Sequence, residues 1–367
     1  MTKLRLGMVG GGPGAFIGPV HGIAARLDDR FILTAGAFSR DGEKNRQAGE
    51  GYGLSPDRVH ATWQDMLAAE KGRLDLIAIV TPNDTHFPIA RAALEAGFNV
   101  LCDKPATLNL EEALTLREVV RKSGKAYGLT YTYSGYPLVR EARKLVADGR
   151  LGQVRKIVVE YSQGWLSQPV HNKQADWRAD PAQSGIGGCI ADIGVHAFHL
   201  SEFVSGAKVE SLCADLGIVV PGRTLDDDCN VLLRYENGIR GVLVSSQIAA
   251  GDRNGLRLRV YGEKGGLDWS QETPNTLTIN WHDQPTQMLH AGTPYLTYGA
   301  RVPAGHPEGY LEAFATLYRD FAMQIKDGEI STGVPSLVPG IEDGVRGMAF
   351  VETAVKSSRN RNWERLL

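Results

Sequence analysis

The feature that most constrains the fold is a glycine-rich loop near the N-terminus. Val9–Ala15 reads VGGGPGA, and it follows an apolar strand pattern at Lys3–Gly10 and precedes a helix pattern at Phe16–Leu27. Glycines between a strand and a helix are typical of a dinucleotide-binding turn, because they allow a tight turn and a close approach of the backbone to a pyrophosphate. Four glycines leave the register of G-x-G-x-x-G open, with Ala15 in the third position if Gly10 is the first.

Strand and helix patterns alternate along the first third of the chain. The further strands are expected at Phe31–Phe38, Leu74–Val80 and Asn99–Cys102, and the further helices at Ile89–Ala96 and Leu110–Lys122. This alternation predicts βαβ units and a parallel sheet, whose strands all end at the edge where ligands bind. We therefore expect an α/β protein with an N-terminal Rossmann domain over residues 1–130.

After about Gly128 the pattern changes to β-branched runs separated by turn residues. Strands are expected at Val154–Tyr161, Val209–Leu216, Cys229–Tyr235, Gly241–Gln247 and Leu256–Tyr261. Helices are expected at Tyr136–Asp148, Ile190–Val204, Gly309–Lys326 and Ile341–Ser357. Hairpin-like spacing favours a large, mainly antiparallel open sheet with helices on one face. We expect residues 131–367 to form this second α/β domain, for substrate binding and oligomerisation.

Composition excludes several classes of partner. The formal net charge is −2 and charges of both signs are mixed along the chain, which argues against nucleic acid and membrane partners. No apolar run is long enough to span a bilayer. The four cysteines form no C-x-x-C pair, which favours reduced thiols and a cytoplasmic protein.

The segment after the second strand should meet the adenine ribose. Ser39 and Arg40, with Lys44 one turn later, would accept the 2′-phosphate of NADP, whereas Asp41 would bond the 2′-hydroxyl of NAD. The sequence leaves both alternatives open.

Two further motifs follow strands of the expected parallel sheet. Thr81–His86 reads TPNDTH, in which Pro82 stiffens the backbone and Asn83 offers amide groups to the nicotinamide half, while His86 could instead be an ordinary helix-start residue. Cys102–Pro105 reads CDKP, and its Lys104 would stabilise an alkoxide forming on a substrate hydroxyl.

An acid and an imidazole share one helix face in the second domain. Asp192 and His196 are four residues apart in the expected helix Ile190–Val204, which a glycine-rich segment precedes. His196 could remove a hydroxyl proton and Asp192 could orient the substrate. A buried structural pair and a metal site with His199 are the alternatives. Metal is disfavoured because His199 lies about 100° further round the helix, so no metal is expected.

The motifs GGGPGAFIG, TPNDTH, CDKP and GGCIADIGVH together resemble the glucose–fructose oxidoreductase / inositol dehydrogenase / MocA family over nearly the whole chain. The resemblance implies a Rossmann domain, a C-terminal α/β domain whose open sheet often forms the oligomer interface, and hydride transfer between NAD(P) and a sugar or cyclitol. It also implies that Lys104, Asp192 and His196 are catalytic. The departure is Asp103, where glutamate is commoner in the family.

Within that family the chain looks most similar to the levoglucosan dehydrogenase branch, through YSQGWL, ADWRADP, LDDD and GHPEGYLEAFA. Aromatic and polar side chains of these stretches make a plausible sugar pocket. The expected substrate residues are Lys104, Tyr133, Trp165, Arg178, Asp192, His196 and His306. The expected cofactor residues are Gly10, Gly12, Gly14, Ala15, Phe16, Ile17, Ser39, Arg40, Thr81, Pro82, Asn83, His86, Asp103, Lys104, Trp177 and Arg178.

The sequence thus predicts an NAD- or NADP-dependent dehydrogenase of a sugar, glycoside or cyclitol, working as a homodimer or homotetramer. Two alternatives stay open: an NAD-dependent glycosidase that oxidises C3 transiently, and a non-catalytic NAD(P)-sensing regulator. The presence of Lys104, Asp192 and His196 argues against the regulator.

Overall fold

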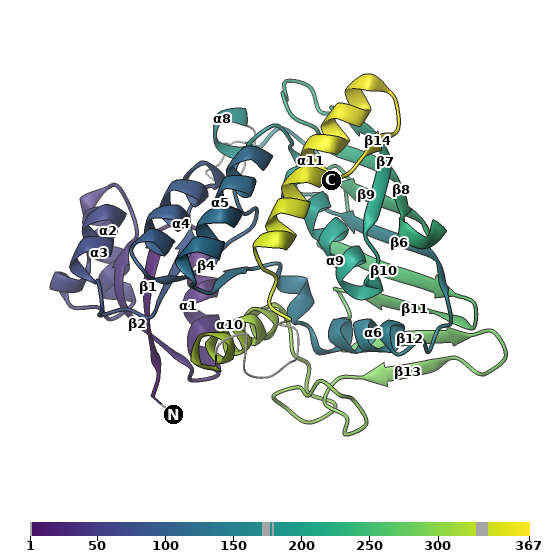
Figure 1. Ribbon diagram of the computed structural model, residues 1–367, viewed down its shortest axis with the longest axis horizontal. Helices are drawn as coiled ribbons and strands as arrows, with labels where there is room; N and C mark the ends of the chain where they lie inside the picture. Colours follow the sequence, from purple (N-terminus) through teal and green to yellow (C-terminus); the bar gives the residue numbers. More distant parts are fainter. Residues whose placement is uncertain (1, 171–176, 178–179, 328–336) are drawn as a thin grey trace. The chain divides into compact units, whose positions relative to one another are not determined.

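The computed structural model describes residues 2–170, 177, 180–327 and 337–367 (Figure 1). Its contacts divide the chain into two compact units. The first contains Met1–Thr132 and Leu311–Val345, and the second contains Tyr133–Tyr310 and Arg346–Leu367. Residues 311–345, which the sequence analysis assigned to the second domain, therefore group with the N-terminal unit.

The first unit is built on a five-stranded parallel sheet in the order β2-β1-β3-β4-β5. The strands are β1 (Leu4–Gly10), β2 (Phe31–Ala37), β3 (Leu76–Val80), β4 (Asn99–Cys102) and β5 (Tyr127–Leu129). The chain runs outward from β1 to β2 and then returns to β3 on the other side of β1. The loops after β1 and β3 therefore diverge, which creates the crevice where α/β sheets of this kind bind ligands.

Helices connect these strands. They are α1 (Ile17–Leu27), α2 (Gly42–Gly51), α3 (Trp63–Ala69), α4 (His86–Glu95) and α5 (Leu110–Ser123), joined by α10 (Tyr310–Asp327) from later in the chain. Right-handed crossovers place α1 on the opposite face of the sheet from α4 and α5. α10 packs beside α1, where the His21 ring meets Phe314 with centroids 5.0 Å apart.

The second unit contains a nine-stranded sheet in the order β13-β12-β11-β10-β6-β9-β8-β7-β14. Its strands are β6 (Val154–Ser162), β7 (Val209–Gly217), β8 (Asp228–Tyr235), β9 (Arg240–Ser246), β10 (Gly255–Gly262), β11 (Gly265–Ser270), β12 (Thr276–Trp281), β13 (Gln287–His290) and β14 (Glu364–Arg365). All pairs are antiparallel except β6 with β9. The predicted α/β class with a mainly antiparallel second sheet is confirmed.

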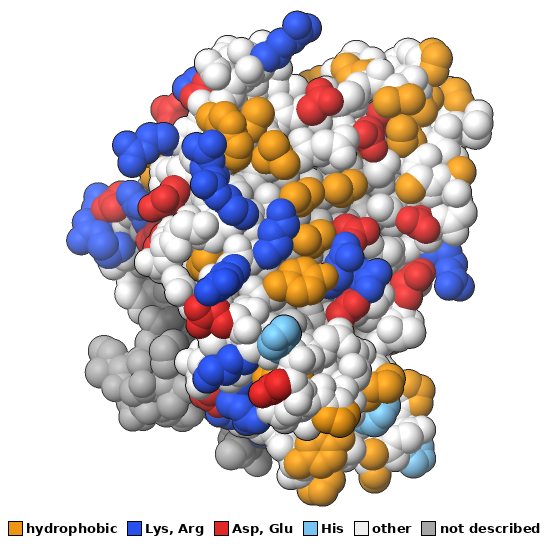
Figure 2. Space-filling view, turned by 90° about the vertical axis from the view of Figure 1, so that its right-hand side faces the viewer, with side chains coloured by type: hydrophobic (Ala, Val, Ile, Leu, Met, Phe, Trp, Pro, Cys, Tyr) orange, Lys and Arg blue, Asp and Glu red, His pale blue; other side chains and the backbone are white. Residues whose placement is uncertain are grey.

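One face of this sheet is covered by helices and the other is open. α6 (Pro137–Ala147), α9 (Val195–Ser205) and α11 (Ile341–Asn360) lie on the covered face (Figure 1). Phe198 of α9 and Phe350 of α11 stack at 4.3 Å in the core between them. Strand alternation sends Leu232 of β8 to the open face, where it is 51% exposed. Figure 2 shows hydrophobic side chains interspersed with charged ones on this side of the molecule.

Several boundaries differ from the sequence expectation for local reasons. α4 begins at His86 and not at Ile89, since a short 3₁₀ turn, η2 (Asn83–Thr85), leads straight into it. The expected helix Ile190–Val204 is divided into a π-helical turn, η4 (Ile190–Gly194), and α9. α5 begins as expected, because the Asn109 side chain accepts the Glu112 amide at 2.9 Å. Among the described residues, no helix is long and apolar enough to cross a membrane.

Candidate active site

The glycine-rich loop lies where the two halves of the parallel sheet diverge. Gly10 ends β1 and pairs with Val80 of β3. Gly10, Gly11 and Gly14 have φ values of 89°, 78° and 79°, which only glycine adopts readily. A Cβ on Gly10 would stand 2.7 Å from the Val80 carbonyl oxygen and 2.7 Å from Cγ2 of Thr81. The loop thus needs glycine for both its turn and its contact with β3.

The close helix–strand contact of the motif is made by Gly18, a residue that the sequence analysis missed. A Cβ on Gly18 would stand 2.3 Å from Cα of Gly11 and 2.8 Å from its carbonyl oxygen. Because α1 begins at Ile17, Ala15 and Phe16 lie in the loop ahead of it. Gly18 is the next glycine of the sequence after the loop, but its position does not fit the G-x-G-x-x-G spacing.

The ribose-side residues have distinct structural positions. Asp41 caps α2, where its Oδ1 accepts the amides of Glu43 at 3.0 Å and Lys44 at 3.1 Å. Ser39 Oγ accepts the Asp41 amide at 3.1 Å, and Arg40 is exposed. Gly12 donates its amide to the Phe38 carbonyl at 3.1 Å, which holds this segment against the loop. The Asp41 carboxylate is therefore engaged by its own helix.

Thr81, Pro82 and Asn83 follow β3 at the same sheet edge. Among the described residues, the buried Thr81 Oγ1 has no hydrogen-bond partner. A buried hydroxyl without a partner is costly, so a ligand group bonded there would be stabilising. This hydroxyl and the glycine cradle beside it fit a dinucleotide lying across the loop.

His86 connects the motif Thr81–His86 to the motif Cys102–Pro105. Its ring is buried, with Nδ1 2.6 Å from the Pro105 carbonyl oxygen and Nε2 2.8 Å from the Thr81 carbonyl oxygen. Both partners are carbonyl acceptors, so the single N–H of a neutral ring donates to one of the two. His86 is expected from the sequence to contact the cofactor; in the structure it braces the segments that follow β3 and β4.

Lys104 stands in a turn that is held from several sides. The carboxylate Oδ1 of Asp103 accepts the Lys104 amide at 2.8 Å and the Thr130 hydroxyl at 2.8 Å. Pro105, in a cis peptide with Lys104, is tied to His86. The position of Asp103 shows why a carboxylate is needed there: it organises the backbone of the lysine turn.

In the second unit, η4 and α9 carry Asp192 and His196. Over Cys189–Glu202, all of which are described, only these two residues escape full burial. The i and i+4 spacing therefore does place them on one accessible side of a buried helix, as the sequence suggested. A π-helical turn holds Asp192, and such turns are frequent at functional sites.

A polar and aromatic cluster surrounds His196. The Tyr133 ring meets the His196 ring edge-on at 5.0 Å, and the Tyr133 hydroxyl bonds that of Tyr161. Asn254 Oδ1 accepts the Tyr161 hydroxyl at 2.8 Å and Nε2 of Gln163 at 2.8 Å. Burial raises the pKa of Tyr133 and Tyr161, which keeps both phenols neutral hydrogen-bonding groups. Tyr161, Gln163 and Asn254 were missed as individual site residues.

Asp192 has a partner that the sequence did not reveal. Gln247, just beyond β9, donates from Nε2 to Asp192 Oδ2 at 2.9 Å. Of the other predicted substrate residues, Trp165 donates from Nε1 to Gln163 at 2.9 Å and so borders the cluster. His306 is exposed and its Nδ1 is 3.2 Å from the Pro303 carbonyl of its own loop. Trp177 is half-buried, and Arg178 lies outside the described residues.

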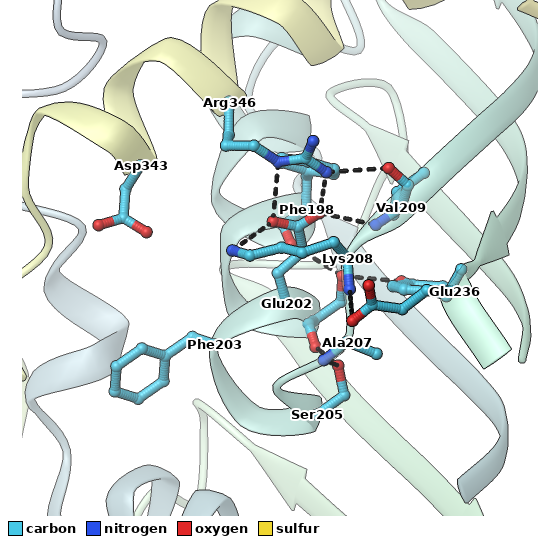
Figure 3. Close-up of polar contacts among 12 residues, drawn as sticks. Phe198, Glu202, Phe203, Ser205, Ala207, Lys208, Val209, Glu236, Asp343 and Arg346 are labelled. Atoms are coloured by element: carbon cyan, nitrogen blue, oxygen red, sulfur yellow. Dashed lines mark hydrogen bonds and ion pairs between the residues drawn. The ribbon is translucent and has the colours of Figure 1, made fainter. Parts of the chain in front are cut away.

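The far end of α9 is fixed by a charged network around Glu202 (Figure 3). Its carboxylate accepts Arg346 Nε of α11 at 3.2 Å, Lys208 Nζ at 3.0 Å and the Val209 amide at 2.9 Å. Arg346 also donates to the Val209 carbonyl at 2.9 Å. Since Glu202 is buried, these partners offset the cost of its charge and hold α9 against α11 and β7. In the described part of the chain, no group of three metal-ligating side chains is found.

Comparison with known proteins agrees with both units. The model of the "oxidoreductase family, NAD-binding Rossmann fold" matches residues 4–131, and that of the "GFO/IDH/MocA C-terminal domain" matches residues 139–268. The uncharacterized oxidoreductase YfiI of Bacillus subtilis is 35% identical, over 97% of this chain and 94% of its own. The levoglucosan dehydrogenase of Pseudarthrobacter phenanthrenivorans is 24% identical, over 98% of each chain.

Among solved structures, an inositol dehydrogenase homolog from Azotobacter vinelandii, complexed with NAD⁺, is 37% identical with a TM-score of 0.95 and covers 99% of this chain and 97% of that one. The fold and these likenesses define a nicotinamide-dinucleotide-dependent oxidoreductase of the sugar and polyol type. The chain belongs to the GFO/IDH/MocA family.

Proposed function

We propose that this enzyme oxidises a ring hydroxyl of a cyclitol, pyranose or glycoside with NAD(P)⁺, or reduces the corresponding ketone. The observation that carries the proposal is that Asp192 and His196 are the two accessible residues of the otherwise buried segment Cys189–Glu202. The ring of Tyr133 lies against that of His196. The N-terminal unit would bind the dinucleotide through the glycine loop, Thr81 and Asn83. The second unit would bind the substrate.

The proposed roles follow from the chemistry of each side chain. Lys104 would stabilise negative charge on the reacting oxygen with its ammonium group. His196 would accept the hydroxyl proton, as an imidazole near neutral pH can. Asp192, oriented by Gln247, would hold the substrate hydroxyl for that transfer. When bound, the nicotinamide supplies the hydride acceptor or donor.

The substrate class is proposed from the relatives and from the cluster around His196. The Azotobacter homolog has also been solved with NADH and myo-inositol, at 36% identity, and levoglucosan is the substrate named for the Pseudarthrobacter relative. Gln163, Trp165 and Asn254 offer amide groups and an indole that suit a polyhydroxylated ring. We expect oxidation at a hydroxyl-bearing ring carbon, such as C3 of levoglucosan.

We also propose a homodimer or homotetramer formed through the open sheet face. Leu232, Val242 of β9 and Val158 of β6 are paired in register and make an apolar row across three strands. Arg259 with Glu160 and Arg257 with Asp268 form ion pairs on the neighbouring strands. An apolar row beside paired charges is suited to a second copy of the same face. Leu232→Lys should lower the oligomer mass in light scattering, whereas Met323→Lys in α10, also exposed, should not.

A cytoplasmic location is proposed because the cofactor is intracellular and the four cysteines are free.

The test is a panel of inositols, pyranoses, levoglucosan and glycosides, scored for NADH and NADPH formation. Lys104→Ala and His196→Ala should each lower kcat by about 10²–10⁴-fold while NADH binding, measured by fluorescence, stays within about threefold. Unchanged turnover in both variants would refute these roles. Release of free aglycone without net NADH would favour the glycosidase, and cofactor binding with no turnover on any substrate would favour the regulator.

A further inference from the structure

The segment Leu225–Asp228 holds two buried carboxylates that bind backbone amides. The sequence predicts this segment in a sugar pocket, but Asp226 Oδ1 accepts the Gly188 amide at 2.7 Å and Oδ2 accepts the Ile190 amide at 2.7 Å. The Asp226 carbonyl accepts the amide between them, that of Cys189, at 2.8 Å. One residue thus holds three successive amides at the start of the helix that carries Asp192 and His196.

The contact is tight and specific. A Cβ on Gly188 would stand 2.2 Å from the Asp226 carbonyl oxygen, so the glycine allows the two segments to meet. Cys229 adds a further donor, with Sγ 3.0 Å from Asp226 Oδ2. Burial raises the pKa of the Asp226 carboxyl, and the amide and thiol donors act against that rise.

The same segment also reaches Asp192 by a second route. The carbonyl of Asp227 accepts the Gln247 amide at 2.9 Å, and the Gln247 side chain donates to Asp192 at 2.9 Å. Asp226 and its neighbour therefore set both the start of the helix and the side chain that orients the Asp192 carboxylate. The segment is therefore connected to Asp192 twice, once through the start of the helix and once through Gln247.

We propose that Asp226 is a positioning residue of the enzyme, which aligns the helix start with Gln247 and so fixes the orientation of the Asp192 carboxylate. This inference rests on the proposed function, since it takes Asp192 to act in catalysis. Asn at position 226 keeps the size and one acceptor oxygen but turns an NH₂ group toward the second amide N–H. The helix start and Asp192 should shift as a result.

The test compares Asp226→Asn with a matched control, Asp227→Asn. Asp227 is the adjacent buried carboxylate, and it accepts the amides of Val219 at 2.8 Å and Val220 at 2.9 Å and Nη1 of Arg223 at 2.9 Å, so its side chain holds a different loop. Asp227→Asn changes only this side chain and keeps the backbone carbonyl that accepts the Gln247 amide. Both variants should lower the melting temperature. Only Asp226→Asn should lower kcat, by about 10–100-fold, because misplacement of about 1 Å at a catalytic group can cost that much. The affinity for NADH should not change.

A double variant tests the route through Asp192. Asp226→Asn combined with Gln247→Leu should lose no more kcat than the worse single variant, since both act on one carboxylate. Multiplying effects would overturn the proposal, as would an Asp226→Asn kcat equal to that of Asp227→Asn. If Asp226→Asn does not fold, Gly188→Ala serves, because it keeps the carboxylate and displaces the segment.

One more variant separates this inference from the proposed function. Asp192→Asn should itself lower kcat at least as far as Asp226→Asn does. Full activity in Asp192→Asn would refute the proposed function of Asp192. Loss of activity in Asp192→Asn with normal activity in Asp226→Asn would refute only the positioning role.

Discussion

Gly18 of α1 packs directly on Gly11 of the nucleotide loop, with the Cβ position of Gly18 only 2.3 Å from the Gly11 Cα. The contact joins the first helix to the loop that would hold the pyrophosphate. A backbone atom cannot yield as a flexible side chain does, so any larger residue at position 18 must move the helix or the loop.

Gly18→Val should therefore weaken NADH binding by about tenfold or more and lower stability by about 1–3 kcal/mol. Fluorescence titration and urea unfolding measure the two effects. Gly51→Ala is the control, because its Cβ would meet nothing described within 4 Å. Equal NADH affinity in Gly18→Val and wild type would contradict the packing argument.

His86→Phe should unfold more easily by about 1–3 kcal/mol, since the buried hydrogen bond between the ring and a backbone carbonyl is lost. It should also lower kcat, because the Pro105 carbonyl beside Lys104 loses its tether. Denaturant unfolding and steady-state rates report the two effects. His282→Phe changes an exposed histidine and should do neither. A His86→Phe protein with wild-type stability would show that the ring is not a brace.

Arg40 is expected to set the choice between NADP and NAD, because the Asp41 carboxylate is occupied in capping α2. Arg40→Ala should lower the ratio of kcat/KM for NADP⁺ over NAD⁺ by about tenfold, the value of one charge-assisted hydrogen bond. Asp41→Ala should cost about 1 kcal/mol of stability and leave that ratio within about threefold. The opposite pattern would assign the ribose contact to Asp41.

His21 should make the protein acid-sensitive. Burial lowers the pKa of His21 to about 4 in the folded chain, against an ordinary value of 6.5. The unfolded chain therefore binds the proton first, so stability present above pH 6.5 is lost as the pH falls toward 4, by about 3 kcal/mol. In His21→Asn the free energy of unfolding should depend less on pH between 6.5 and 4. Tyr318→Phe removes its 2.8 Å partner but should keep the slope.

Arg346 should be more important for stability than an ordinary surface arginine. Removing it leaves the buried Glu202 without its α11 partner, so Arg346→Ala should cost about 3 kcal/mol or more (Figure 3). Arg346→Lys should recover part of that, because an ammonium cannot bond Glu202 and the Val209 carbonyl with the same planar fork. Arg253→Ala, an exposed ion pair with Glu272, should change stability by less than about 1 kcal/mol. Thermal unfolding ranks the three.

The sequence by itself determined the local elements and the chemistry-bearing residues that depend on them. Apolar periodicity located the strands, Asn109 located the start of α5, and the glycine cluster Gly10–Gly14 located the nucleotide loop. The spacing of Asp192 and His196 placed both on one side of a helix. These features depend on residues within a few positions of each other, so short-range pattern suffices.

Only the tertiary structure decided which polar groups serve the backbone. Gly18 meets Gly11 across the first helix turn, His86 bonds Pro105, and Asp226 bonds amides 36 and 38 residues away. A carboxylate that caps a helix and one that binds a sugar are the same group in sequence. They differ in which donors the folded chain brings to them, and those donors come from distant segments. For the same reason the helix-capping contacts of Asp41 and the backbone contacts of Asp226 follow from the fold and not from the sequence pattern.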